Sequence, residues 1–138
     1  MKRYLLDTSL FAGFLHKRAK AIEIITPWVR NHEAATSILV YGEVIEYLKG
    51  LPDFSKHYTN FHKVLEEIVP HPLSYVILDR YADIRRKMRQ PHGKGLIGDI
   101  DTLIAATALE HDLTLVTIDR DFDRVPNLKW QFVNFNAA

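Results

Sequence analysis

The chain has 138 residues, of which 47% are hydrophobic and 25% charged, a balance typical of a globular protein with a real core. Its formal net charge of +1 is low for a dedicated duplex-DNA binder, but it allows an enzyme that contacts phosphates through a local patch. The absence of cysteine excludes disulfides, thiolate metal sites and cysteine nucleophiles.

The chain begins with a short apolar run, Tyr4–Leu6, that ends at Asp7. This run is too short for a secretory signal peptide, and no other apolar run approaches the ~20 residues of a membrane span. We therefore expect no membrane segment and a soluble, cytoplasmic protein that forms one domain over residues 1–138. The run itself is typical of a buried strand whose carboxyl end carries Asp7.

Helical and strand patterns alternate along the rest of the chain. We expect Thr8 or Ser9 to cap a first helix, and the apolar spacing from Ala21 to Val29 predicts a second, with a kink or break at Pro27. The remaining predicted segments are helices over about 38–49, 58–68, 74–89 and 99–111, strands over 34–37, 113–117 and 129–135, extended chain at 70–72, and a Gly-rich loop over 90–98. Alternating strands and helices predict an α/β domain with a mostly parallel sheet.

Acidic residues follow the first predicted strand and the strand near residue 115, at Asp7 and Asp119. Ligands of open parallel α/β sheets bind beyond the carboxyl ends of the strands. Asp101 lies in the first turn of the last predicted helix, and Glu43 lies within an otherwise apolar helix. Carboxylates that share one edge repel each other unless a cation neutralises them, and oxygen ligands suit Mg²⁺ or Mn²⁺.

Each acid also has a purely structural interpretation, and the residues alone leave both open. Asp7 could cap a helix, and Asp119 could belong to a turn. Asp99 and Asp101 could be acids that the helix dipole favours. Glu43 could pair with a lysine. The predicted topology thus allows a metal site without requiring one.

Four sequence motifs, in the same order and spanning nearly the whole chain, resemble those of PIN-domain proteins. Tyr4–Ser9 (YLLDTS) is similar to the opening motif, and Thr36–Val44 (TSILVYGEV) is similar to the second. Gly98–Ala108 (GDIDTLIAATA) is the most specific match, because it resembles the Asp-x-x-Ile-Ala-Ala helix of VapC-type toxins. Leu115–Phe122 (LVTIDRDF) resembles the closing motif.

The resemblance implies a three-layer α/β/α PIN fold and hydrolysis of RNA phosphodiester bonds with Mg²⁺ or Mn²⁺. The family's catalytic and metal-binding positions fall on Asp7, Glu43, Asp101 and Asp119. Asp101 rather than Asp99 takes the third position because it directly precedes the Thr-Leu-Ile-Ala-Ala run. Auxiliary contacts to carboxylates or waters are expected from Thr8, Ser9, Asp99, Thr117 and Asp121. A water activated by the cation would attack a backbone phosphorus and leave 5′-phosphate and 3′-hydroxyl ends.

A basic stretch precedes the last predicted helix, and it has two interpretations. It is either a solvated helix face with local ion pairs or a surface that binds RNA phosphates. The RNA-binding candidates within it are Arg85, Arg86, Arg89 and Lys94. A second cationic group, after the first predicted helix, could add to this surface: His16, Lys17, Arg18 and Lys20. The seven histidines show no paired metal-binding spacing, so we expect neither a zinc site nor a histidine base.

Apolar residues are abundant on the first two predicted helices, where they form either core or a partner-binding face: Phe11, Phe14, Leu15, Ile24, Ile25, Trp28 and Val29. The resemblance implies a homodimer and an antitoxin that blocks the acidic site. It therefore favours the toxin of a type II toxin–antitoxin pair, since the chain length leaves no room for an accessory domain. The alternatives are a PIN-domain RNA-processing nuclease and a non-catalytic RNA- or protein-binding PIN module, although the intact acidic set opposes the module. A haloacid-dehalogenase-like phosphatase is excluded because Ser9 stands where its second aspartate would be.

Overall fold

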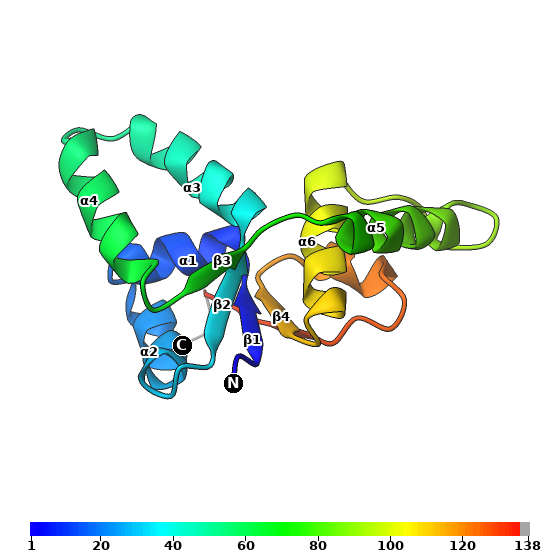
Figure 1. Cartoon of the computed structure of the whole chain (residues 1–138), viewed down its shortest axis with the longest axis horizontal. Helices are drawn as coiled ribbons and strands as arrows, with labels where there is room; N and C mark the ends of the chain where they lie inside the picture. The colour runs from blue at the N-terminus through cyan, green and yellow to red at the C-terminus, as the bar shows by residue number, and fades with distance from the viewer. Residues whose placement is uncertain (136–138) are drawn as a thin grey trace.

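The computed structural model describes residues 1–135, and the last three residues of the predicted domain lie outside that range. Within the described residues, six α-helices flank a five-stranded sheet in three layers (Figure 1). The strands are β1 (Tyr4–Leu6), β2 (Ala34–Ser37), β3 (Val69–His71), β4 (Thr114–Thr117) and β5 (Trp130–Phe132). All neighbouring pairs are parallel, in the order β3-β2-β1-β4-β5. The predicted α/β fold with a parallel sheet is confirmed.

Helices cover both faces of the sheet (Figure 1). On one side lie α1 (Thr8–Leu15), α2 (Ala19–Arg30), α3 (Ile38–Lys49) and α4 (Phe54–Val64). On the other lie α5 (Tyr75–Met88) and α6 (Asp99–Glu110), which pack against each other. The longest of these helices has 14 residues, and none within residues 1–135 has the length and apolar character needed to cross a membrane.

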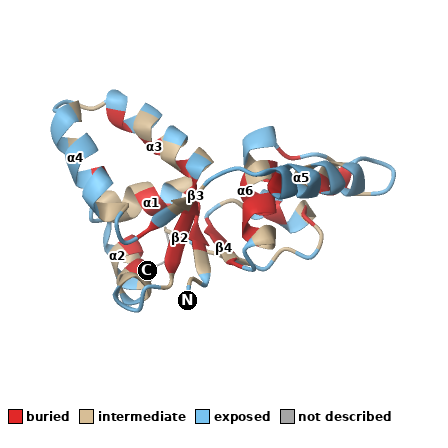
Figure 2. Ribbon diagram, viewed as in Figure 1, coloured by how far each residue is buried: buried red, intermediate tan, exposed pale blue. Residues whose placement is uncertain are grey.

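The core lies on the strands and on the helix faces that point toward them (Figure 2). Leu5, Leu6, Leu115 and Val116, from the central strands β1 and β4, have no exposed surface. Parallel strands with helices on both faces are buried on both sides, which explains why these strands are apolar without alternation.

Four details differ from the sequence-based expectation. The predicted cap at Thr8 or Ser9 is wrong, because Asp7 is the N-cap of α1. Helix α2 is not broken at Pro27, which faces solvent, where the carbonyl left without its usual donor can bond water. Helix α4 begins and ends four residues earlier than predicted. The extended chain around Pro70 is a strand, β3, at the edge of the sheet, where proline is tolerated because its missing N–H need not join a second ladder.

Candidate functional site

The carboxyl ends of the central strands bring two acids together. Strands β1 and β4 are adjacent and parallel, with Leu6 opposite Val116, so Asp7 and Asp119 follow neighbouring strands at the same edge. Helix α3 starts directly at the end of β2, and the first turn of α6 lies at the same end of the sheet (Figure 1). These helices supply Glu43 and Asp101.

The four acids line one open hollow of about 480 Å³. Its other lining residues are Thr8, Ser9, Ile118 and Arg120. Residues from four separate elements, more than a hundred positions apart in the chain, therefore share one surface.

Asp7 is the most buried of the four acids, with 9% of its surface exposed. Its Oδ2 accepts a hydrogen bond from the Thr117 hydroxyl at 2.7 Å, and its Oδ1 accepts from the Thr8 backbone N–H at 2.8 Å. Burial raises the pKa of Asp7, the two hydrogen bonds oppose that rise, and the charges of Glu43 and Asp119 add to it. The same side chain therefore caps α1 and lines the hollow.

Asp101 shows most clearly that the acids act on one another. Burial and then the charges of Asp7, Asp119 and Glu43 raise its pKa from 3.8 to about 6. The charge of Asp121 adds a smaller rise, so this half-buried carboxyl group lies in the negative field of four other acids. A bound cation would relieve this repulsion.

Hydrogen bonds fix the two remaining acids. The Thr8 hydroxyl donates to Glu43 Oε1 at 2.5 Å, which links α1 to α3. The Asp119 backbone N–H donates to Thr117 Oγ1 at 3.0 Å, and Asp119 Oδ1 accepts from the Asp121 N–H at 2.8 Å. The lysine partner considered for Glu43 is not found among its contacts within residues 1–135; its partner there is a threonine.

The chemistry of this donor set fits a hard divalent cation. The side chains that line the hollow offer carboxylate and hydroxyl oxygens, which suit Mg²⁺ or Mn²⁺ and not a thiolate-bound zinc. Within the described part of the chain, no three acidic or histidine side chains are already clustered around one point. The carboxylates therefore surround the hollow rather than closing on a single position.

Asp99 and Asp121, the two acids among the predicted auxiliary residues, do not line the hollow, although the charge of Asp121 still acts on Asp101. Asp99 Oδ1 accepts hydrogen bonds from Arg85 at 2.6 Å and from the Tyr81 hydroxyl at 3.0 Å. Asp121 has Arg124 at 3.9 Å, and neither acid lines the hollow. The geometry thus separates Asp101, inside the hollow, from Asp99, which ties α6 to α5.

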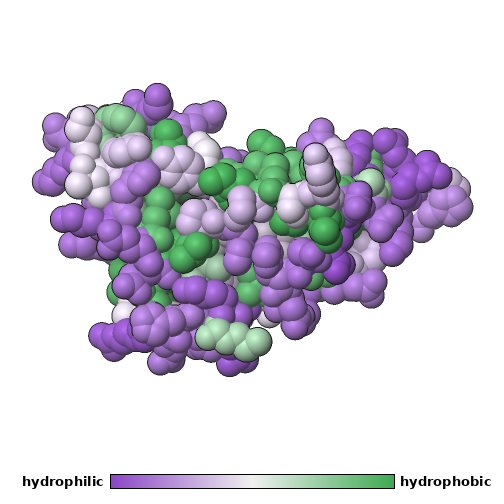
Figure 3. Space-filling view, in the orientation of Figure 1, coloured by the Kyte–Doolittle hydropathy of each residue, from purple (hydrophilic) through white to green (hydrophobic). Residues whose placement is uncertain are grey.

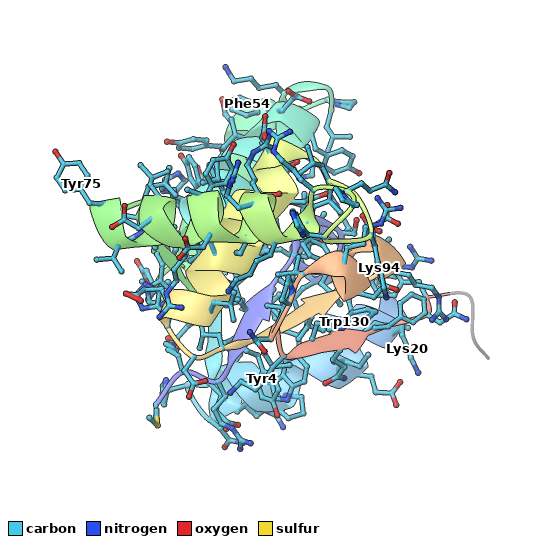
Figure 4. All side chains as sticks on the ribbon, turned by 90° about the vertical axis from the view of Figure 1, so that its right-hand side faces the viewer. Tyr4, Lys20, Phe54, Tyr75, Lys94 and Trp130 are labelled. Atoms are coloured by element: carbon cyan, nitrogen blue, oxygen red, sulfur yellow. The ribbon has the colours of Figure 1, made fainter. Side chains whose placement is uncertain are left out.

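The predicted RNA-binding cations also lie outside the hollow. None of Arg85, Arg86, Arg89 and Lys94 is among its lining residues. Lys94 has Asp123 at 3.9 Å, and Figure 4 shows it at the end of α5 far from Tyr75. Any contact of this group with RNA would therefore lie outside the acidic hollow, with Arg85 nearest to it through its bond to Asp99.

A cation that the sequence-based reasoning missed lines the hollow itself. Arg120 is exposed there, and its guanidinium lies 3.8 Å from the centre of the Phe132 ring, which orients it. The sequence feature that could have identified Arg120 is its position directly after Asp119, at the end of a predicted strand.

Comparisons with known proteins agree with this architecture. The sequence profile of the PIN domain matches residues 4–128. No curated protein matches the chain by sequence.

Several solved structures have a similar fold. VapBC2 from Rickettsia felis, bound to a DNA fragment from its promoter, is 22% identical with a TM-score of 0.81, over 95% of this chain and 98% of that one. DNA-bound VapBC from Salmonella typhimurium is 16% identical with a TM-score of 0.82, over 96% and 98%. A toxin–antitoxin complex from Klebsiella pneumoniae is 21% identical with a TM-score of 0.72, over 98% and 99%.

Proposed function

The chain belongs to the PIN domain family, and from that premise we propose that it is a metal-dependent endoribonuclease and the toxin of a type II toxin–antitoxin pair. The observation that carries the proposal is the convergence of Asp7, Glu43, Asp101 and Asp119 on one hollow. Burial of Asp101, and then the charges of the neighbouring acids, raise its pKa and so destabilise the cation-free fold at neutral pH, and a bound cation would offset this cost.

In this proposal the four acids hold Mg²⁺ or Mn²⁺, which when bound activates water and stabilises charge on a phosphoryl group. The protein's own side chains orient the carboxylates and neutralise the charge of the phosphate. Thr117 and Thr8 hold the carboxylates of Asp7 and Glu43 in fixed orientations through their hydroxyls. Arg120 offers a charge to an RNA phosphate at the edge of the hollow, which the carboxylates alone would repel. The products would carry 5′-phosphate and 3′-hydroxyl ends.

RNA is proposed as the substrate because Gly98–Ala108 resembles the corresponding helix of VapC-type toxins. The test is cleavage of single-stranded RNA and DNA with Mg²⁺, with Mn²⁺ and with EDTA. We expect EDTA, Asp7→Asn and Asp101→Asn each to abolish RNA cleavage while the circular dichroism spectrum is unchanged. Asp99→Asn is the matched control, since this acid lies in the same helix but outside the hollow. Activity that survives Asp101→Asn but not Asp99→Asn would transfer the role to Asp99.

A protein antitoxin is the proposed partner, because the structural neighbours include a toxin–antitoxin complex of the same fold. This function places the protein in the cytoplasm. Expression of the chain alone should arrest growth, and co-expression of a short upstream reading frame should relieve the arrest. RNA cleavage without growth arrest would favour an RNA-processing nuclease, and RNA binding without cleavage would favour a non-catalytic module.

A homodimer is also proposed, but the face considered for it on the first two helices is mostly core. Phe11 and Ile25 are fully buried, and the other five apolar residues considered for that face pack against the core. Exposed apolar side chains lie instead around the start of α5, and Figure 3 shows hydrophobic surface over the connection from β3 to α5: Leu73, Tyr75, Val76 and Leu78. Tyr75 is 88% exposed and extends away from the helix (Figure 4).

We propose that a second copy of the chain packs against this surface at the start of α5. Because none of these residues lines the acidic hollow, the dimer would leave the hollow accessible. Light scattering should give a dimer mass for the wild type and a monomer mass for Tyr75→Asp/Leu78→Asp. A dimer mass for both proteins would exclude this surface.

A further inference from the structure

A second hollow, of about 420 Å³, adjoins the acidic one. Thr8, Ser9 and Ile118 line both hollows, so the two are direct neighbours with a shared wall. The remaining lining of the second hollow comes from α1, from the end of α3 and from the chain after β5. A ligand held in the acidic hollow can therefore extend directly into this one.

The two hollows have opposite chemical character. Four carboxylates line the first, whereas the residues that line the second include no acid. Its charged side chain is Arg18, and its larger walls are the rings of Tyr47, Phe135 and His16. A flat, apolar group linked to an anion is the ligand that such a surface fits.

The aromatic rings are held in place by their neighbours. The Arg18 guanidinium lies 4.2 Å from the centre of the Phe135 ring. The His16 ring meets the Tyr47 ring edge-on at 5.4 Å, and Tyr47 still has 49% of its surface exposed. Gly13 allows the close approach of Phe135, because a Cβ there would lie 3.3 Å from the ring and would push it outward. The site is thus preformed, with one tyrosine face open to solvent.

We propose that this second hollow binds an unpaired nucleobase of the RNA strand next to the bond that is cut, with Tyr47 as the stacking surface and Arg18 as the contact to the adjoining phosphate. The inference rests on the proposed function, and it adds that the substrate must be single-stranded at this position. A base paired in a duplex cannot present its face to Tyr47. Stacking on an aromatic ring is tolerant of sequence, so we expect this contact to require a base without requiring a particular one.

The first experiment uses a single-stranded RNA with a mapped cut, and versions with one abasic ribonucleotide on either side of it. We expect the abasic change at one side to raise KM about 10-fold in the wild type, with kcat nearly unchanged, on the scale of one base–aromatic stack. Tyr47→Ala should raise KM by about the same factor on intact RNA, and the abasic change should then have no further effect.

Two variants control for the loss of the ring. Tyr47→Phe keeps the aromatic face and should keep the wild-type KM. Tyr58→Ala removes a tyrosine on α4 that is 38% exposed and lines neither hollow, so it should leave KM unchanged. An abasic effect of equal size in the wild type and in Tyr47→Ala would overturn the proposal.

The second experiment needs no cleavage. Adenosine 5′-monophosphate and ribose 5-phosphate are titrated into the protein in EDTA, and amide shifts are followed by NMR. The nucleotide should shift the amides of Gly13 and Tyr47 more than the sugar phosphate does. Arg18→Ala should weaken both ligands, whereas Arg30→Ala, at an exposed arginine of α2, should weaken neither.

The outcomes separate this inference from the proposed function. Nucleotide binding in the second hollow without any RNA cleavage would overturn the nuclease and support the base site. RNA cleavage with no dependence on the flanking base would overturn the base site and support the nuclease. If a co-expressed partner protein shifts these amides and the nucleotide does not, the hollow belongs to that partner, and the proposal is overturned.

Discussion

Thr117 is a fully buried residue at the end of β4 whose hydroxyl lies between two of the acids. Its Oγ1 donates to Asp7 Oδ2 at 2.7 Å and accepts from the Asp119 backbone N–H at 3.0 Å. One side chain thereby sets the position of two carboxylates that follow different strands. Valine has nearly the same shape but offers neither contact.

Thr117→Val should lower the free energy of unfolding by about 1–3 kcal/mol, because a buried carboxylate and a backbone N–H each lose a partner. RNA cleavage should lose kcat with little change in KM, since the acids are misplaced while the RNA surface remains. Chemical denaturation and steady-state kinetics measure the two effects. Thr117→Ser keeps the hydroxyl and should retain most of both properties. Wild-type kcat in the valine variant would remove Thr117 from any positioning role.

Asp101 makes the stability of the cation-free protein depend on pH. Its pKa in the folded state is about 6, above its ordinary value of 3.8, so the folded protein keeps this proton after the unfolded chain has lost it. Stability therefore falls as the pH rises from about 4 to about 6, and the full cost is present above that window. Each pKa unit is worth about 1.4 kcal/mol, and discounting for the solvent exposure of this half-buried group leaves about 1–2 kcal/mol.

Asp101→Asn should consequently stabilise the protein at pH 7 in EDTA, because the amide has no charge to be buried or to be repelled by the other acids. We expect a rise of a few degrees in the thermal midpoint at pH 7, and almost none at pH 4, where the aspartic acid is already protonated. Melting curves at the two pH values provide the measurement, with Asp83→Asn as an exposed control. Equal shifts at both pH values would mean that charge is not the cause.

At the scale of elements, the sequence predicts most closely those that position the site. Helix α3 begins and ends at the predicted residues, 38 and 49, and α6 ends within one residue of its prediction. Both helices carry strong local signals at their ends. Strand β3 lacks such a signal, because three residues with a proline become a strand only through pairing with β2. Helix α4 was misplaced because Leu65 and Ile68 continue its apolar pattern from the turn that follows it.

The candidate site was predicted only in part, for a physical reason. The four acids lie at strand ends and within helices, and these positions could be predicted from local sequence patterns and from the order of the four motifs. From the residues alone, a cap could not be told from a site residue, and the structure shows that Asp7 caps α1 and also lines the hollow. Arg120 and the second hollow depend on how Phe132 and Phe135 fold back after β4, and no local pattern encodes that.

Substitution of two glycines would show how tightly the backbone is packed at each position. A Cβ on Gly93, in the loop between α5 and α6, would lie 2.2 Å from the Lys87 carbonyl oxygen and 2.6 Å from Met88 Cα, both backbone atoms. A Cβ on Gly42, within α3, would meet nothing within 4 Å. The same substitution should therefore have opposite effects at the two positions.

Gly42→Ala should raise the free energy of unfolding by about 0.5–1 kcal/mol, because alanine loses less entropy in a helix. Gly93→Ala should lower it by about 1–3 kcal/mol, because the loop backbone must move. Urea denaturation of the two variants and the wild type measures both changes under the same conditions. A stable Gly93→Ala protein would show that the loop adapts at no cost.

At the scale of the whole molecule, the acidic hollow is lined by residues from both the first and the last parts of the chain. Asp7 and Glu43 belong to the first third of the sequence, and Asp101 and Asp119 to the last third. The pairing of β1 with β4 brings these parts together, and the repulsion between the acids opposes it. A cation bound among the acids would convert this repulsion into a link between the two parts, so the whole fold should respond to it.

Mg²⁺ should therefore stabilise the folded chain by the free energy of binding to the native state, about 1.4 kcal/mol at ten times its Kd and about 2.7 kcal/mol at a hundred times. The thermal midpoint of the wild type should rise with Mg²⁺ concentration and fall back on addition of EDTA. In Asp7→Asn/Asp101→Asn the rise should be absent, since half of the carboxylates are gone. The control variant Asp83→Asn/Asp99→Asn has the same net charge as that double variant, but its hollow is intact. It should therefore respond to Mg²⁺ as the wild type does. A rise of equal size in both double variants would show that the cation acts on the general surface charge and not through the four acids.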